Sequence, residues 1–492
     1  MSQGAIACRV TASADSVVLR VDSGHRLLAQ GRHAAALAIA EAVLGEGHDT
    51  VDAHVLHGAA LKALRRFPSA VAAFEAALAR EPARAAVWVS LGNSHAELGD
   101  LAAAEACLRR ALALRPEMRA AHASLIGVCA MRRRDDATEE ACRAALAVDA
   151  DLVNAHQYLA DILARRGEAA AARRHREAAY RRQNLFVEPS AWPGPTVLVL
   201  LTVEDGNIPL KYLFSQDNTT LLKWLIEYAA PGQAARLPRA DIVFNAVGEP
   251  DLPPATHAAI ERFRRTTPLP FLNPPARVLR TTRKDLPGLL AGLPDVVVPP
   301  VWVCRAGDPA PILPALVRPV GSHGGEGLVL ATTAEAFAAA LPAGGDAYVT
   351  AFVDFGASDG GWRKYRAIFV DRRPFPYHLA IGDRWLVHYY TADMAADAAR
   401  RAEEARFLSD PEGAIGARAM AALAAIGARL DLDYGGIDFS VLPDGRVLVF
   451  EANATMVVHP ETEGGVFAYK NNAVRAILDT FAAMVTRRIG DR

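Results

Sequence analysis

The stretch YGGIDFSVLPDGRVLVFEAN, residues 434–453, contains two strand-like runs joined by a turn. The runs Ile437–Leu442 and Val447–Phe450 are apolar. Pro-Asp-Gly-Arg between them, at residues 443–446, is a hairpin turn signal. The stretch therefore predicts two neighbouring antiparallel strands in the C-terminal part of the chain.

Three polar residues belong to this hairpin: Asp438, Glu451 and Asn453. Because side chains alternate between the two faces of a strand, Glu451 and Asn453 share a face, and the hairpin can bring Asp438 opposite them. Two carboxylates and an amide oxygen suit Mg²⁺, which takes hard oxygen ligands and leaves room for substrate phosphates. The alternative is a pair of exposed acids at the ends of a hairpin.

The same residues resemble the metal-binding end of the ATP-grasp family, in which an Asp is followed thirteen residues later by Glu-x-Asn. The family includes carboxylate–amine ligases such as D-alanine–D-alanine ligase and glutathione synthetase. The resemblance runs from about Pro195 to the C-terminus. It implies an α/β pre-ATP-grasp domain at residues 196–275 and an α+β ATP-grasp domain at residues 276–492, with ATP and one or two Mg²⁺ ions, or Mn²⁺, as cofactors.

Basic residues upstream of the hairpin stand where the family contacts phosphate groups. Lys284, which opens an expected helix, resembles the lysine that approaches the ATP phosphates, and Arg283 competes with it because the register is open by one residue. Arg318 replaces the family's usual lysine, which keeps the charge but changes the donor geometry.

Arg366 lies in Trp-Arg-Lys-Tyr-Arg-Ala, a run that resembles the strand carrying an arginine into the glutathione synthetase site. The resemblance implies that Arg366 steadies the transferring phosphoryl group or the developing oxyanion. Its neighbours Arg363 and Lys364 are interpreted as a solvated face. Arg366 and Arg318 are therefore the expected catalytic residues.

A glycine-rich loop follows Arg318, at residues 321–327, and resembles the phosphate lid of the family. Glycines let backbone N–H groups close over phosphate oxygens, although tight turns use the same residues. Residues 346–354 resemble the adenine-binding hinge, and Asp354 and Asp359 compete for the ribose. The nucleotide contacts implied by the resemblance are Lys284, Arg318, Ser322, Gly324, Gly325, Gly327, Thr350, Phe352, Asp354 and Asp359.

The expected hairpin at residues 375–390 is unusually rich in aromatic residues and histidines. We expect it to line the acceptor site, with cross-strand aromatic packing as the alternative. The residues that follow the metal-binding hairpin are near enough in sequence to face the substrate as well. The expected substrate residues are His378, Arg384, His388, His459 and Lys470.

The first 186 residues repeat with a period of 34, which points to tetratricopeptide (TPR) helix pairs. His54, Trp88, His122 and His156 mark the period, and packing is the favoured role of the histidines. In step with them, small residues should let paired helices approach and large ones should fill the space between them. These residues include Gly58, Gly92, Ala70, Ala104, Phe74 and Leu108.

Residues 17–185 are therefore interpreted as about five helix pairs forming an all-α solenoid, and residues 186–195 as a linker. Its concave groove is expected to hold a peptide or protein, with a passive spacer or oligomerisation surface as the alternative. Beyond the linker, apolar runs at residues 197–203 and 241–245 predict strands, and residues 221–230 and 254–264 predict helices. Alternating strands and helices indicate a small parallel sheet.

Length, net charge and cysteine content indicate a multidomain protein and argue against several classes of protein. A length of 492 residues predicts at least two domains, and the net charge of −1 gives no uniform field to attract nucleic acid or an anionic membrane. Five scattered cysteines argue against a disulfide framework and a zinc site. With no visible secretory signal and no apolar run long enough to span a membrane, the cytoplasm is the expected location.

Taken together, the resemblance implies that ATP activates a carboxylate as an acylphosphate, which an amine then attacks to form an amide. The solenoid would present a peptide, a protein or a partner. The resemblance leaves open whether the chain forms a homodimer. Three alternatives are a small-molecule amino-acid ligase whose solenoid binds nothing, a phosphotransferase on the same fold, and a scaffold with an inactive site.

Overall fold

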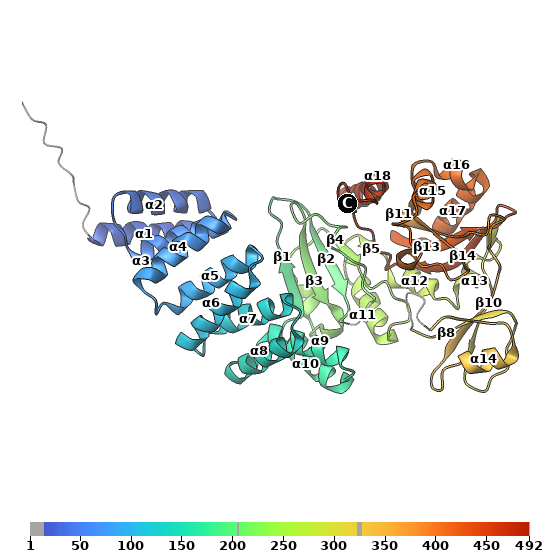
Figure 1. The fold of residues 1–492 in the computed structure, drawn as a ribbon, viewed down its shortest axis with the longest axis horizontal. Coiled ribbons are helices and arrows are strands. Elements are labelled where there is room, and N and C mark those ends of the chain that lie inside the picture. Colours follow the sequence, from blue (N-terminus) through green and yellow to red (C-terminus); the bar gives the residue numbers. More distant parts are fainter. Residues whose placement is uncertain (1–13, 204–205, 322–326, 492) are drawn as a thin grey trace, which may run out of the picture. The chain divides into compact units, whose positions relative to one another are not determined.

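The computed structural model describes residues 14–203, 206–321 and 327–491. The chain divides into two compact units, Met1–Gln183 and Asn184–Arg492. The first unit is helical, and the second contains the sheets (Figure 1). The predicted loop residues Ser322, Gly324 and Gly325 lie outside the described residues.

Ten helices in the described residues of the first unit form a solenoid of five pairs, which confirms the predicted all-α region (Figure 1). Each helix packs against the next along the chain, so neighbouring pairs bury each other's apolar faces. The helices are α1 (Ala14–Ala29), α2 (His33–Gly45), α3 (Val51–Ala63), α4 (Phe67–Arg80), α5 (Ala85–Glu97), α6 (Leu101–Leu114), α7 (Arg119–Met131), α8 (Asp135–Val148), α9 (Val153–Arg165) and α10 (Ala169–Arg182).

Small residues set how closely the paired helices approach. A Cβ atom added to Gly58 in α3 would lie 2.7 Å from the ring of Phe74 in α4. One added to Gly92 in α5 would lie 3.0 Å from Leu108 in α6. Phe74 and Leu108 are both buried, so the large side chains fill the space that the glycines leave.

The repeat position of Trp88, His122 and His156 has the same role in three repeats. In each case a ring nitrogen meets the backbone carbonyl oxygen six residues earlier, just beyond the end of the preceding helix. The distances are 2.9 Å from Trp88 to Pro82, 2.8 Å from His122 to Pro116 and 3.0 Å from His156 to Ala150. Trp and His can therefore alternate here, because both carry a ring N–H that satisfies this carbonyl.

The second unit begins with a five-stranded sheet in the order β1-β3-β2-β4-β5, parallel except for β1. Helix α11 (Pro254–Arg264) packs on one face and helix α18 (Asn471–Gly490) on the other, which explains why the strands are continuous apolar runs. The strands are β1 (Leu185–Glu188), β2 (Thr196–Leu201), β3 (Thr220–Leu225), β4 (Ile242–Asn245) and β5 (Phe271–Leu272).

Two predictions about this sheet are wrong. Residues 221–225, expected to be helical, lie in β3, and only Ile226–Tyr228 form a short 3-10 helix. Apolar residues at 221, 222 and 225 fit a helix face as well as a strand buried on both faces, so periodicity could not separate them. Residues 186–188, assigned to the linker, belong to β1, which pairs with β3.

Two antiparallel-rich sheets complete the unit (Figure 1). The four-stranded sheet packs against helix α14, and this second five-stranded sheet packs against helices α15 and α17. The first contains, in spatial order, β7 (Val301–Cys304), β10 (Ala347–Ala351), β8 (Ala315–Pro319) and β9 (Val329–Ala331). The second contains β12 (Arg373–Gly382), β11 (Trp362–Val370), β13 (Tyr434–Val441), β14 (Val447–Asn453) and β6 (Val296–Val297). The helices named with these sheets are α14 (Ala334–Ala340), α15 (Ala398–Ser409) and α17 (Ala417–Leu430).

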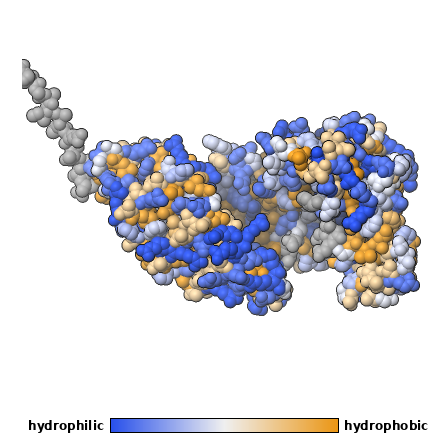
Figure 2. All heavy atoms as spheres, in the orientation of Figure 1, coloured by the Kyte–Doolittle hydropathy of each residue, from blue (hydrophilic) through white to orange (hydrophobic). Residues whose placement is uncertain are grey.

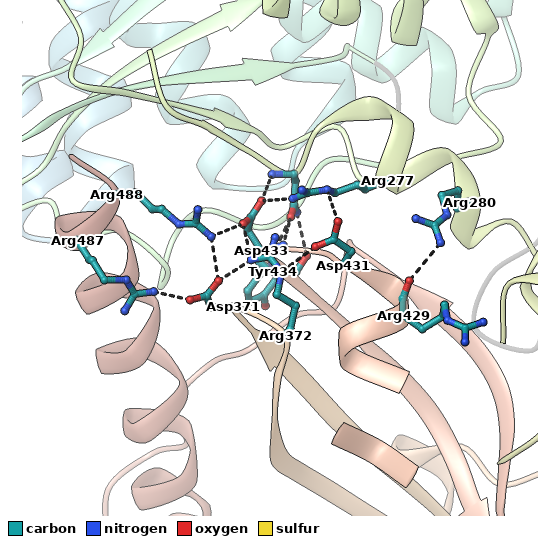
Figure 3. Close-up of polar contacts among 11 residues, drawn as sticks. Arg277, Arg280, Asp371, Arg372, Arg429, Asp431, Asp433, Tyr434, Arg487 and Arg488 are labelled. Atoms are coloured by element: carbon teal, nitrogen blue, oxygen red, sulfur yellow. Dashed lines mark hydrogen bonds and ion pairs between the residues drawn. The ribbon is translucent and has the colours of Figure 1, made fainter. Parts of the chain in front are cut away.

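A polar network fixes the start of β13 (Figure 3). Asn273 donates and accepts four hydrogen bonds of 2.8–3.0 Å with Asp433 and Tyr434, from a backbone with φ of 50° that Asn tolerates. Arg372, in the turn between β11 and β12, pairs with Asp433 at 3.1 Å, and Arg488 of α18 pairs with it at 3.3 Å. Three separate segments therefore hold the strand that carries Asp438.

The outer surface of the solenoid is strongly polar in part. Figure 2 shows hydrophilic side chains gathered over the last helix pairs, where α10 exposes Arg173, Arg174, Arg181 and Arg182. Across the part of the chain that the structure describes, every helix is too short or too polar to cross a lipid bilayer.

Candidate active site

A cavity of about 250 Å³ lies between the two sheets of the C-terminal part. One wall comes from β8 and β10, and the other comes from β11, β13 and β14. Its charged lining residues are Arg283, Arg318, Lys364, Arg366, Asp438 and Glu451.

The hairpin of β13 and β14 positions the two acids. Gly445 has a φ of 82° and closes the predicted turn, in which its N–H donates to the Leu442 carbonyl at 2.8 Å. The register then pairs Asp438 directly with Glu451. An irregularity follows Asp438 in the ladder, and such bulges re-aim side chains.

Basic side chains surround both carboxylates. Asp438, which is 0% exposed, receives Arg366 Nε at 2.6 Å and Lys364 Nζ at 2.7 Å. Arg283 meets Glu451 at 2.6 Å. With Arg318, four cations and two carboxylates line the cavity among the described residues.

This arrangement keeps the acids ionised. Burial alone would raise the pKa of Asp438, but Lys364 and Arg366 outweigh burial and hold the pKa far below its usual range. Burial also opposes ionisation of Glu451, and Arg283 does most to lower its pKa. The pKa of Arg318 is lowered by burial and by the nearby Arg283, an effect that an anionic ligand would offset.

Apolar side chains also line the cavity. Ala351 follows Thr350 at the end of β10, Phe352 lies just beyond this strand, and Leu448 and Phe450 come from β14. Trp385 packs edge-on against Phe352, with ring centroids 6.1 Å apart. An apolar lining with backbone polar groups, together with cationic side chains, suits a flat heterocycle linked to a chain of anionic groups.

The cavity contains some of the predicted nucleotide contacts and not others. Arg318, Thr350 and Phe352 line it, as do Arg366 and both acids. Lys284 is exposed and does not, and the competing residue Arg283 lies in the cavity instead. The helix near these residues starts only at Leu286, so Lys284 precedes it and points elsewhere.

Three further predicted nucleotide contacts lie outside the cavity. Asp354 accepts a hydrogen bond from the Gly356 N–H at 2.9 Å, and Asp359 pairs with Arg363 at 2.7 Å, so local turns engage both acids. Gly327 has a φ of 67° and packs near Pro319 instead of lining the cavity.

The sequence pattern does not identify Lys364 as a site residue, since it is interpreted there as part of a solvated face. It lines the cavity, while its neighbour Arg363 turns to Glu403 and Asp359. Strand alternation was the available signal: residues 364 and 366 share a face of β11, and Arg366 was already a candidate.

Two of the three predicted metal ligands fit Mg²⁺. Asp438 and Glu451 offer carboxylate oxygens on one wall, and bound phosphates could complete the coordination shell. Asn453 does not fit here, because its side-chain oxygen accepts hydrogen bonds from the N–H and O–H of Thr455, each at 2.5 Å. The described residues hold no group of three or more His, Cys, Asp or Glu side chains arranged to bind a metal.

A second cavity, of about 400 Å³, adjoins the first. Lys364, Arg366 and His388 line both. Four of the five predicted substrate residues line the second cavity, namely His378, His388, His459 and Lys470. Arg384 is exposed at the β12 turn and lines neither cavity.

Two histidines of the second cavity, His378 and His388, have a lowered pKa. Burial, followed by Arg366, lowers the pKa of His378 well below its ordinary value. Burial and Lys364 lower the pKa of His388. His378 also stacks on Tyr389 with ring centroids 4.6 Å apart, so part of the predicted aromatic packing coexists with a cavity wall.

Comparison with known proteins bears on the first unit. A tetratricopeptide-repeat family model matches residues 55–119 and 89–151, so the N-terminal region carries TPR repeats. The crystal structure of MamA is 18% identical, over 32% of this chain and 94% of MamA, with a TM-score of 0.31. Pseudomonas aeruginosa pilF is 19% identical over 34% of this chain and 77% of pilF, with a TM-score of 0.32. No curated protein matches.

Proposed function

We propose that the second unit is an ATP-dependent carboxylate–amine ligase with an ATP-grasp fold, which forms an amide or peptide bond through an acylphosphate. The observation that carries this proposal is the cavity in which Asp438 faces Glu451 amid four cations and which apolar side chains also line. The four cations favour a polyphosphate, and the apolar lining of the cavity suits adenine.

The residues suggest a division of roles. Arg283, Arg318 and Lys364 would hold phosphate oxygens, and Arg366 would stabilise charge on the transferring phosphoryl group. Mg²⁺ bound to Asp438 and Glu451 would neutralise charge between the reacting oxygens. Its binding would release Lys364, Arg366 and Arg283 from their carboxylate partners for contacts with the substrates.

The proposed reaction has two steps. A carboxylate oxygen bonds to the γ-phosphorus of ATP as the bond to the β-phosphate oxygen breaks, which releases ADP. The amine nitrogen then bonds to the acyl carbon, and inorganic phosphate and a proton leave. Positioning is the main contribution expected of the protein in such transfers.

A screen of carboxylate and amine pairs for ADP release, followed by mass spectrometry of the products, tests the proposal. A ligase yields ADP, phosphate and a product joined by an amide. A phosphorylated product without phosphate release would identify a phosphotransferase instead. Absence of both Mg·ATP binding and ADP release with every pair would leave only the scaffold alternative.

For the first unit, we infer that the solenoid presents a peptide, a protein or a partner to the ligase. TPR repeats generally mediate protein or peptide interactions, which supports this role. The buried free cysteines, Cys107, Cys129, Cys142 and Cys304, are compatible with the reducing cytoplasm that we propose as its location.

A further inference from the structure

An ion pair between a buried lysine and a half-buried glutamate lies in the second cavity. The Lys470 ammonium lies 3.1 Å from the Glu461 carboxylate, and Lys470 is only 2% exposed. The ammonium also donates to the Tyr389 hydroxyl at 3.1 Å and lies 4.3 Å from the centre of the same ring. Both charged residues line this cavity.

Neighbouring residues hold the pair in place. The Glu461 N–H donates to the Asn471 side chain at 2.7 Å, and the Asn471 amide donates back to the Glu461 carbonyl at 3.1 Å. The Tyr389 hydroxyl donates to the buried Glu404 at 3.1 Å, so its oxygen is left to accept from Lys470. The cavity therefore offers a fixed cation and a fixed anion side by side.

The pair lies away from the first cavity. Lys470 and Glu461 line only the second cavity, whereas Lys364 and Arg366 form the wall that both cavities share. A ligand in the second cavity thus meets charges of both signs at one place and two further cations at the shared wall. Met394, Val457 and Phe467 supply apolar surface.

We propose that the second cavity binds an acidic α-amino acid: Lys470 takes its α-carboxylate, Glu461 takes its α-ammonium, and its side-chain carboxylate reaches Lys364 and Arg366. This rests on the proposed function, since the side-chain carboxylate would be the group that ATP phosphorylates. Two charges of opposite sign match a zwitterionic head, whereas a simple dicarboxylate would need only the cations.

The pair could instead serve only to fasten the start of α18. The two roles differ in what they predict for ligands. A fastening pair makes no distinction between an amino acid and the same acid without its amino group. A recognition pair does, because the analogue leaves Glu461 without a partner.

Calorimetric titration of the full chain in the presence of Mg²⁺ with L-aspartate, L-glutamate and L-2-aminoadipate, without nucleotide, provides the test. We expect one of them to bind at least about tenfold more tightly than its analogue that lacks the amino group, such as glutarate for glutamate. The analogue without the α-carboxylate, 4-aminobutyrate for glutamate, should be weakened similarly. Failure of all three amino acids to bind, or equal affinity for the analogues, would overturn the proposal.

Variants assign the contacts. Glu461→Gln should weaken binding of the amino acid about tenfold and leave the analogue without the amino group unchanged. Lys470→Met should abolish the preference for the α-carboxylate, and Lys470→Arg should restore part of it. The control is Lys223→Met, which breaks another Lys–Glu pair of the same unit, at 2.5 Å from Glu188 and outside both cavities. If Lys470→Met does not fold, Glu461→Gln and the ligand series still decide.

Two measurements separate this proposal from the proposed function. Amino-acid binding that depends on Glu461 and Lys470, without ADP release when ATP and Mg²⁺ are added, would contradict only the proposed ligase function. ADP release that depends on Asp438, requires another kind of acid and is not changed by Glu461→Gln would contradict only the amino-acid proposal.

Discussion

At the scale of single residues, Asp438 and Glu451 decide whether the cavity can do phosphoryl chemistry. Asp438→Asn or Glu451→Gln should lower ADP release by on the order of a hundredfold or more, because each removes a charge that would hold Mg²⁺. The measurement is steady-state ADP release at saturating Mg·ATP. Wild-type rates in both variants would exclude a metal role for these acids.

The matched control for these variants is Asp444→Asn, the same chemical change in the exposed turn of the same hairpin. It should leave ADP release within about twofold of wild type, since Asp444 lines neither cavity. Asp438→Asn also leaves Lys364 and Arg366 without their carboxylate, so melting temperatures must be compared first. A lost fold would show there, separately from a lost reaction.

Two adjacent basic residues offer a test of register. Arg283→Met should weaken binding of a non-hydrolysable Mg·ATP analogue by about tenfold or more, since Arg283 faces the cavity and charge-assisted phosphate contacts are strong. Lys284→Met should leave affinity unchanged, because Lys284 is exposed. Calorimetric titration of both variants decides between them. The opposite ranking would assign the phosphate contact to Lys284 instead of Arg283.

These residues also show how far sequence can go. The hairpin that pairs Asp438 with Glu451 follows from two apolar runs and a Pro-Asp-Gly turn, which act locally. Whether Arg283 or Lys284 faces the cavity depends on the backbone conformation just before a helix of only five residues, Leu286–Leu290. The engagement of Asn453 by Thr455 depends on a turn beyond the strand end, which no strand periodicity encodes.

At the scale of elements, the repeats could be predicted because small and large residues alternate at a fixed period. Gly58→Ala should lower the melting temperature of the solenoid, because the new Cβ would lie 2.7 Å from the Phe74 ring. Overpacking of this kind costs about 1–3 kcal/mol, which exceeds the gain of about 1 kcal/mol in helix propensity. Helical circular dichroism during heating of the full chain measures the change.

Gly127→Ala is the matched control for this variant. Gly127 also lies inside a helix, α7, but a Cβ atom there would meet nothing within 4 Å. The same substitution should therefore stabilise the solenoid by about 0.5–1 kcal/mol. If Gly58→Ala were also stabilising, helix propensity would outweigh packing and the close approach of α3 and α4 would be less rigid than the structure indicates.

The β3 segment shows where element prediction fails. Leu221, Leu222 and Leu225 satisfy helix and buried-strand spacings alike, and only pairing with the neighbouring strands β2 and β1 favours the extended form. In contrast, helix α11 begins and ends at the predicted residues, because a proline pair starts it and its apolar residues face the sheet. Local signals were sufficient there, whereas β3 depends on partners distant in sequence.

At the scale of the whole molecule, each described core cluster lies within one of the two units. Separate cores imply that the units can fold independently. A fragment of residues 184–492 should therefore bind Mg·ATP as the full chain does. If it bound the nucleotide much more weakly, the first unit would contribute to the site.

The residue at which the fragment begins should affect its stability. Asn184 joins the second unit through hydrogen bonds of 2.6 Å to the Tyr228 carbonyl and 2.7 Å from Gln233, and β1 pairs with β3 along residues 185–188. A fragment of residues 189–492 loses these contacts and uncovers an edge strand, so it should melt at a lower temperature and aggregate sooner than 184–492. Thermal melting and light scattering of the two fragments measure this difference. Equal melting temperatures would mean that residues 186–188 belong to the linker of residues 186–195 that sequence alone predicts.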